Sequence, residues 1–193
     1  MELKIFQEFF DCCVGHWSTE RTYHYMTRQE VERSHTDFFV HPLANDLKRK
    51  VLTDNNYALP DPLDSFPGYH LEFATVSETG EEVQQQLNLL FVPTVNVGEA
   101  IEGDYLRDRA YEEDRPIISH FRFHNSNREL LMTTRYRRVI AVDSITLINP
   151  ELRIRKIITY ERPQTDQPPE KVVLVGFGVE QKIKTPPISP ETT

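Results

Sequence analysis

The chain has no apolar run long enough to cross a membrane as a helix, and its first residues lack the basic start and apolar core of a secretion signal. We therefore expect a cytoplasmic protein without membrane insertion. Cysteine is also scarce: the only two among 193 residues are the neighbours Cys12 and Cys13. Neighbouring cysteines cannot form an ordinary unstrained disulfide, which fits a reducing compartment.

Positive charge is in deficit, with 22 Lys and Arg against 30 Asp and Glu and a net charge of −8. An acidic protein is repelled by phosphate backbones, so we expect no nucleic-acid partner. The chain has no Gly-rich phosphate loop, and residues 15–18 lack the second glycine of a nucleophile elbow. His120 and His124 share a face of a predicted strand but have no third ligand nearby, so we expect no metal site.

The N-terminal segment has the pattern of a short amphipathic helix over residues 3–14. Phe6 and Phe10 recur at helical spacing with other apolar residues, while charged and amide side chains fill the opposite side. The pattern predicts that a Phe-rich face packs on a larger body. Cys12 and Cys13 belong to this segment, and we expect them to be structural rather than reactive.

Beyond the helix, short runs of β-branched and aromatic residues alternate with Gly, Pro, Asn and Asp. They predict about ten strands, at residues 20–28, 35–40, 70–77, 84–93, 103–109, 116–124, 128–137, 139–147, 151–160 and 171–182. Most links are short, which favours antiparallel neighbours; the exception is Pro42 to Pro67, where residues 46–51 are expected to form a helical turn.

Ten antiparallel strands in one sheet tend to curl, and closure removes the open edges. We therefore expect an all-β fold, a ten-stranded antiparallel up-and-down barrel with an N-terminal α-helix, whose cavity can hold one small ligand. A β-sandwich is the alternative. Residues 1–183 are expected to form this single domain, and residues 184–193 a proline-rich disordered tail.

Two arginines and one aspartate are the strongest candidates for a binding site. Arg153 and Arg155 share one face of a predicted strand and could each hold a ligand carboxylate. The alternative is a solvated outer face. Asp143 lies in phase with Ile145 on the preceding strand, so it must be paired, accept hydrogen bonds or have a raised pKa.

Three further candidates lie near the start of the first predicted strand: Trp17, Arg21 and His24. Trp17, the only tryptophan, suits either stacking on a ligand or plugging the end of a barrel beside the N-terminal helix. Arg21 shares its face with tyrosines and suits cation–π contact as well as ligand binding.

Several ordered motifs carry a resemblance to a known family. They are Phe9-Phe10 followed by Gly15-x-Trp17-Ser18-x-x-Arg21-Thr22-x-His24, then Leu106-Arg107-Asp108-Arg109-Ala110-Tyr111, Thr133-Thr134-Arg135-Tyr136, and the block Asp143 to Arg155 with Asn149-Pro150-x-Leu152-Arg153-x-Arg155. Together they resemble the S-type phycobiliprotein lyases, and the resemblance covers nearly the whole domain.

The resemblance implies a lipocalin-like barrel that binds an open-chain tetrapyrrole, a bilin such as phycocyanobilin, and attaches it by a thioether bond to a cysteine of a phycobiliprotein subunit. It implies Arg153, Arg155 and Asp143 as bilin-site residues, with Asp143 as the catalytic carboxylate where relatives commonly have Glu, and Glu180 as a further carboxylate.

The resemblance also has consequences for partners. We expect acceptor subunits of the phycocyanin or allophycocyanin type, no tightly bound cofactor, a possible homodimer, and a place in the cyanobacterial cytosol or plastid stroma. Many relatives carry tryptophans in the region where this chain has Tyr69, Leu71 and Phe73, so ring stacking on the bilin would either be weaker or use Phe and Tyr instead. Two alternatives are a carrier of a fatty acid or other apolar carboxylate without transfer chemistry, and a ligand-free assembly factor for phycobilisomes.

Overall fold

The computed structural model describes residues 2–58, 62–109, 115–164 and 167–184. Its elements, in chain order, are α1 (Glu2–Cys13), β1 (Gly15–Tyr25), β2 (Glu30–Pro42), α2 (Asn45–Asp54), the short 3-10 helix η1 (Leu63–Ser65), β3 (Gly68–Ser77), β4 (Glu82–Val97), β5 (Ala100–Arg107), β6 (Ile117–His124), β7 (Glu129–Arg135), β8 (Val139–Asn149), β9 (Leu152–Glu161) and β10 (Val172–Lys182).

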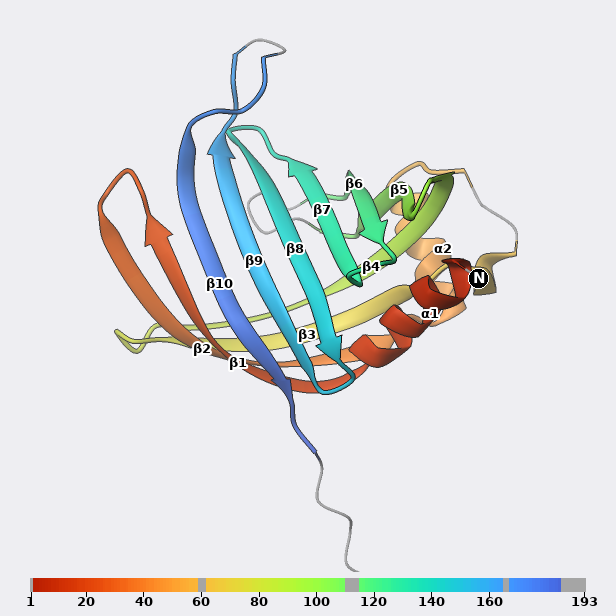
Figure 1. Cartoon of the computed structure of the whole chain (residues 1–193), viewed down its shortest axis with the longest axis horizontal. Helices are drawn as coiled ribbons and strands as arrows, with labels where there is room; N and C mark the ends of the chain where they lie inside the picture. The colour runs from red at the N-terminus through yellow and green to blue at the C-terminus, as the bar shows by residue number, and fades with distance from the viewer. Residues whose placement is uncertain (1, 59–61, 110–114, 165–166, 185–193) are drawn as a thin grey trace, which may run out of the picture.

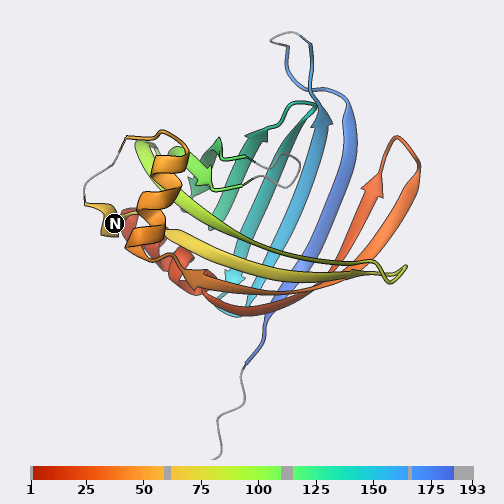
Figure 2. The same cartoon turned by 180° about the vertical axis from the view of Figure 1, so that it is seen from behind.

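The ten strands form one closed antiparallel barrel in which each strand pairs with its neighbours in sequence and β1 also pairs with β10. Figure 1 shows β7 to β10 as one wall, with β1 to β4 passing behind them, and Figure 2 shows the same barrel from behind. Closure pairs every strand edge. The predicted up-and-down barrel with an N-terminal helix is therefore confirmed, and the sandwich alternative is wrong.

Helix α1 closes one end of the barrel with the Phe-rich face that its sequence pattern predicts. Phe6, Phe9 and Phe10 are each at most 2% exposed. Phe10 packs edge-on against Phe91 of β4, with 4.8 Å between ring centroids, and Phe9 contacts Phe123 of β6 at 5.0 Å. This cluster of rings fills one end of the barrel, which leaves the space for a ligand above it.

Several segments extend beyond their predicted bounds, among them β1, which begins at Gly15 instead of residue 20. Strand β2 begins at Glu30 instead of residue 35, directly after a tight turn in which Gln29 has a φ of 57°. Its first four residues, Glu30 to Arg33, include one apolar side chain, and three of the four are exposed, so they lack the apolar run used to predict strands. Strand β4 passes Pro93 at a register shift, and α2 forms ten residues of helix where only a turn was predicted.

Helix α2 lies outside the barrel and covers part of β4 and β5 (Figure 2). Val51 and Leu52 are fully buried against Leu90 and Leu106 on the outer faces of these strands. No helix in the described part of the chain is long and apolar enough to span a membrane. Residues 185–193 of the predicted tail lie outside the described residues.

Candidate functional site

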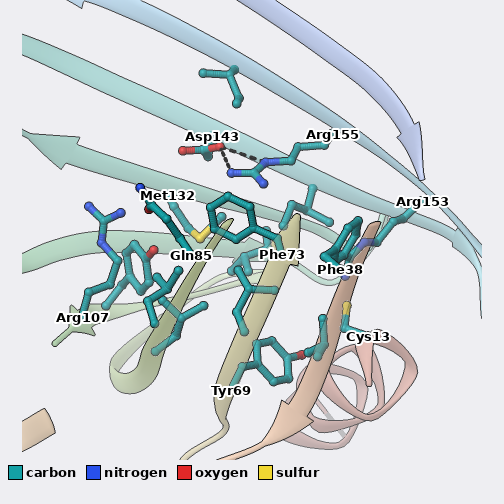
Figure 3. A pocket seen from close by; sticks show the side chains of 18 of the residues that line it. Cys13, Phe38, Tyr69, Phe73, Gln85, Arg107, Met132, Asp143, Arg153 and Arg155 are labelled. Atoms are coloured by element: carbon teal, nitrogen blue, oxygen red, sulfur yellow. Dashed lines mark hydrogen bonds and ion pairs between the residues drawn. The ribbon is translucent and has the colours of Figure 1, made fainter. Parts of the chain in front are cut away.

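The barrel encloses a cavity of about 350 Å³, within the roughly 300–1,000 Å³ typical of small-molecule sites. Its walls come from α1, β1 to β5 and β7 to β9. Most lining side chains are apolar, and Phe73 and Met132 lie near the centre of the view in Figure 3. Tyr69, Leu71 and Phe73 all line this space.

Arg153 and Glu180 form a buried ion pair beside the cavity. They are directly opposite each other on the neighbouring strands β9 and β10, and Arg153 Nε donates a hydrogen bond to Glu180 Oε2. Arg21 of β1 reaches the same carboxylate, with its Nη2 3.6 Å from Glu180 Oε1. Burial alone would raise the pKa of Glu180, but the guanidinium groups of Arg153, Arg155 and Arg21 outweigh it and hold that pKa below its ordinary value.

Arg155 and Asp143 form a second pair, higher in the cavity and closer to water. The Nε and Nη2 atoms of Arg155 both donate to Asp143 Oδ1, at 3.1 and 2.7 Å (Figure 3). Both side chains are about one-fifth exposed. Arg153, Arg155 and Asp143 thus face the barrel interior, and the alternative of a solvated outer face is wrong.

These pairings change what the arginines can do for a ligand. The sequence suggests that Arg153 and Arg155 hold one ligand carboxylate each, but each guanidinium already binds an internal carboxylate. With Arg21, the group contains three guanidiniums and two carboxylates, a net charge of +1. This cluster, defined as Arg21, Arg153, Arg155, Asp143 and Glu180, is therefore suited to one additional carboxylate rather than two.

Trp17 lies under the cluster and does not line the cavity. Its side chain is fully buried, and its indole N–H donates to the carbonyl of Cys13 at 2.9 Å. The guanidinium of Arg153 sits 4.4 Å from the centre of the indole ring, and the Phe38 ring lies nearly parallel to it. In this position Trp17 joins β1 to α1 at the closed end and supports Arg153 from below.

His24 does not join the other predicted site residues. On β1, Trp17 and Arg21 point inward, so the alternation of the strand directs His24 outward. There its ring stacks on Phe177 of β10, with 6.4 Å between centroids. The structure therefore places His24 on the outer surface, away from the cavity to which the sequence had assigned it.

The cysteines differ in their surroundings. Cys13 is buried at the edge of the cavity, and burial raises the pKa of its thiol despite the nearby guanidinium of Arg153. A thiol held in its neutral form is a poor nucleophile, in agreement with a structural role. We expected both cysteines to lie in the core, but only Cys13 is buried and Cys12 is partly exposed.

Arg107 is a charged cavity residue that the sequence analysis did not assign to the site. It belongs to one of the motifs behind the resemblance, but no role was attached to it. It ends β5, is 3% exposed, and points into the barrel from the side opposite Arg153 in Figure 3. The sequence did carry a signal for it: Arg107 lies two residues after Tyr105 on a strand, so the two share a face whose other residues are apolar.

Comparison with known proteins is consistent with this geometry. The family described as CpeS-like protein matches residues 5–183. Chromophore lyase CpcS/CpeS 1 of Synechococcus sp. (strain JA-3-3Ab) is 60% identical over 181 residues, covering 94% of this chain and 98% of that protein. Phycocyanobilin lyase subunit CpcS of Picosynechococcus sp. (strain ATCC 27264 / PCC 7002 / PR-6) is 22% identical and covers 77% of this chain and 75% of that protein.

A solved structure shows the same fold. The S-type phycobiliprotein lyase CPES from Guillardia theta superposes with a TM-score of 0.72 at 18% identity, covering 93% of both chains. At that identity the match shows the fold alone. The family match over residues 5–183, together with the 60% identical relative, shows that this chain belongs to the CpeS-like family.

Proposed function

We propose that this chain is a chromophore lyase that binds a bilin in the barrel cavity and delivers it to a cysteine of a phycobiliprotein subunit. The observation that carries the proposal is the charge of an otherwise apolar cavity. Among the described residues, the guanidinium groups of Arg21, Arg107, Arg153 and Arg155 and the carboxylate of Asp143 line it, and the Glu180 carboxylate lies beside it. A bilin is an apolar conjugated chain with two propionates, so it matches the cavity in both respects.

The bond-forming step requires little of this chain. The thiolate of the acceptor cysteine adds to the ethylidene group of bilin ring A and forms a thioether, so the nucleophile belongs to the partner. The lyase holds a flexible pigment in one conformation and presents ring A at the open end of the barrel, opposite α1. The acceptor is proposed to be a subunit of the phycocyanin or allophycocyanin type, in the cyanobacterial cytosol or plastid stroma.

A carrier of a monocarboxylate such as a fatty acid is the second candidate, because the same barrel would hold its chain. The bilin is favoured because the 60% identical relative is named a chromophore lyase. A ligand-free assembly factor would have no use for the cavity of about 350 Å³.

Binding of phycocyanobilin tests the function directly. We expect the purified protein to shift and sharpen the red absorption band of the pigment, and to bind the free acid more tightly than its dimethyl ester because the ester cannot pair with guanidinium groups. An absorbance titration against both pigments measures this. A spectrum that stays unchanged at excess protein refutes the proposal, and competition by a fatty acid without any pigment binding would favour the carrier.

We propose that Asp143 keeps the bound bilin protonated, since its carboxylate can accept the pyrrole N–H groups and stabilise their positive charge. Replacing Asp143 with Asn should therefore shift the bound red band to the blue, weaken it, and slow transfer to the acceptor thiol. The matched control is Glu129→Gln, a carboxylate about as exposed that binds Ser144 on the outer face. An Asp143→Asn variant with parental spectrum and transfer rate would remove Asp143 from the site.

A further inference from the structure

We propose that Gln85 of β4 binds the lactam of bilin ring A at the open end of the barrel. A lactam is a cyclic amide, and each terminal ring of a bilin carries one. The inference rests on the proposed function, in which ring A faces the acceptor thiol, and it names the side chain that holds this ring in place.

Three consecutive glutamines lie near the start of β4, and only the middle one lines the cavity. The alternation of the strand places Gln85 in the inward row with Leu87 and Leu89, while Gln84 and Gln86 face outward. The amide of Gln85 thus interrupts a row of inward side chains that is otherwise apolar, and Figure 3 shows it among the residues around the cavity.

The height of Gln85 in the barrel suits a ring at the open end. Further along β4, Phe91 contacts Phe10 of α1, the helix that closes the other end. From Gln85 to Phe91 the strand rises roughly 20 Å, at about 3.3 Å per residue. Gln85 is also exposed, so its amide lies where the thiol of an acceptor protein would meet the pigment.

A glutamine amide complements a lactam in its hydrogen bonds. The lactam presents one N–H donor and one carbonyl acceptor on the same edge, and a carboxamide has both counterparts, so two parallel hydrogen bonds form, as when glutamine reads the edge of adenine. Guanidinium groups only donate and carboxylates only accept, so the charged cluster cannot satisfy both lactam atoms with one side chain. Gln85 is the only carboxamide among the described residues that line the cavity.

The amide of Gln85 is available to a ligand, since it forms no hydrogen bond within the described part of the chain. Other neutral polar groups of the cavity are engaged: the Tyr69 hydroxyl donates to a backbone carbonyl of α1 at 2.9 Å, and the Thr75 hydroxyl is hydrogen-bonded to that of Thr36 at 2.9 Å. Phe73 is the residue directly opposite Gln85 on β3 and also lines the cavity. A pyrrole-type ring whose edge pairs with Gln85 therefore has an aromatic side chain next to its face.

The test uses the full chain and three pigments, with binding followed by absorbance: phycocyanobilin, and its derivatives O-methylated at the lactam of ring A or of ring D. O-methylation gives a lactim ether, which has neither the N–H nor the carbonyl. The parent should bind the ring A ether about 5- to 100-fold more weakly than the pigment, the range expected for two neutral hydrogen bonds. The ring D ether should bind close to the parental value.

Gln85→Met keeps the length of the side chain but removes the amide. This variant should bind the pigment more weakly by a similar factor, and should bind the pigment and the ring A ether within about twofold of each other, because the interaction is already lost. Gln86→Met is the matched control: it makes the same change on the outer face, opposite Glu72, and should keep the parental preference.

A parent that binds the pigment and the ring A ether equally overturns the inference and leaves the proposed function standing. So does a Gln85→Met variant with the parental preference, which would trace the weaker binding of the ether to the size of its methyl group. A loss confined to the ring D ether would show the pigment in the reverse orientation and also overturn the inference. A parent that binds none of the three pigments refutes the proposed function, and this inference with it. If Gln85→Met does not fold, Gln85→Leu replaces it, with the same expected loss of preference.

Discussion

Replacing Glu180 with glutamine should lower the free energy of unfolding by about 3–5 kcal/mol, because it leaves Arg21 and Arg153 side by side in the barrel without their shared carboxylate. Glu180 is fully buried, so water cannot take over its role. In a domain of this size the loss corresponds to a fall in melting temperature of roughly 6–20 °C. Urea unfolding followed by circular dichroism measures it.

The contribution of Glu180 to the free energy of unfolding should decrease in acid. Its pKa is lower in the folded than in the unfolded chain, so its contribution is complete above about pH 4.3, the ordinary value for glutamate. The contribution is lost as the pH falls towards the lowered folded pKa, because protonated Glu180 resembles the glutamine. The difference in stability between parent and variant should therefore be constant near neutral pH and shrink in acid.

Glu161→Gln is the matched control for this prediction. Glu161 pairs with Lys171 at the other end of the β9 and β10 hairpin, but both side chains are more than half exposed. A pair in water contributes about 0–1 kcal/mol, so this variant should unfold close to the parent. Equal stabilities of Glu180→Gln and Glu161→Gln would show that the buried pair does not hold the barrel together.

The sequence predicted the barrel because its signals are local. Runs of alternating or apolar residues marked the strands, and short links left few ways to arrange them. The missed parts were those in which polar residues face water, such as the start of β2 at Glu30, or in which a strand continues past Pro93. There the pairing partner decides the structure, and the partner is distant in sequence.

The sequence predicted which strand face carries the charged site residues, but not which residues they contact. Alternation along the strands correctly directed Arg153, Arg155 and Asp143 inward together. It could not show that Arg153 meets Glu180 and that Arg155 meets Asp143, since those contacts depend on the register between strands. Sequence alone therefore suggests that Arg153 can be truncated without loss of fold, whereas its burial beside Glu180 predicts a cost in stability.

Variants of Trp17 distinguish the two roles that the sequence leaves open for it, stacking on a ligand and plugging the end of the barrel. Replacing it with alanine should lower the free energy of unfolding by about 3–5 kcal/mol, the usual cost of removing a large buried ring. Trp17→Phe keeps most of the ring but loses the 2.9 Å hydrogen bond to the Cys13 carbonyl, which leaves a buried acceptor without that donor and costs about 1–3 kcal/mol. Circular dichroism must report unfolding, because both variants lack the chain's only tryptophan.

The affinity for phycocyanobilin distinguishes a structural role from ligand stacking. Because Trp17 lies beneath Arg153 and outside the cavity lining, folded Trp17→Phe should bind the pigment within about twofold of the parent, a difference of roughly 0.4 kcal/mol. Phe73→Leu is the control within the cavity: it removes a lining ring and should weaken pigment binding more than it lowers stability. A Trp17→Phe variant of parental stability with much weaker pigment binding would instead place the indole against the ligand, and the closed end would have to open for the bilin to reach it.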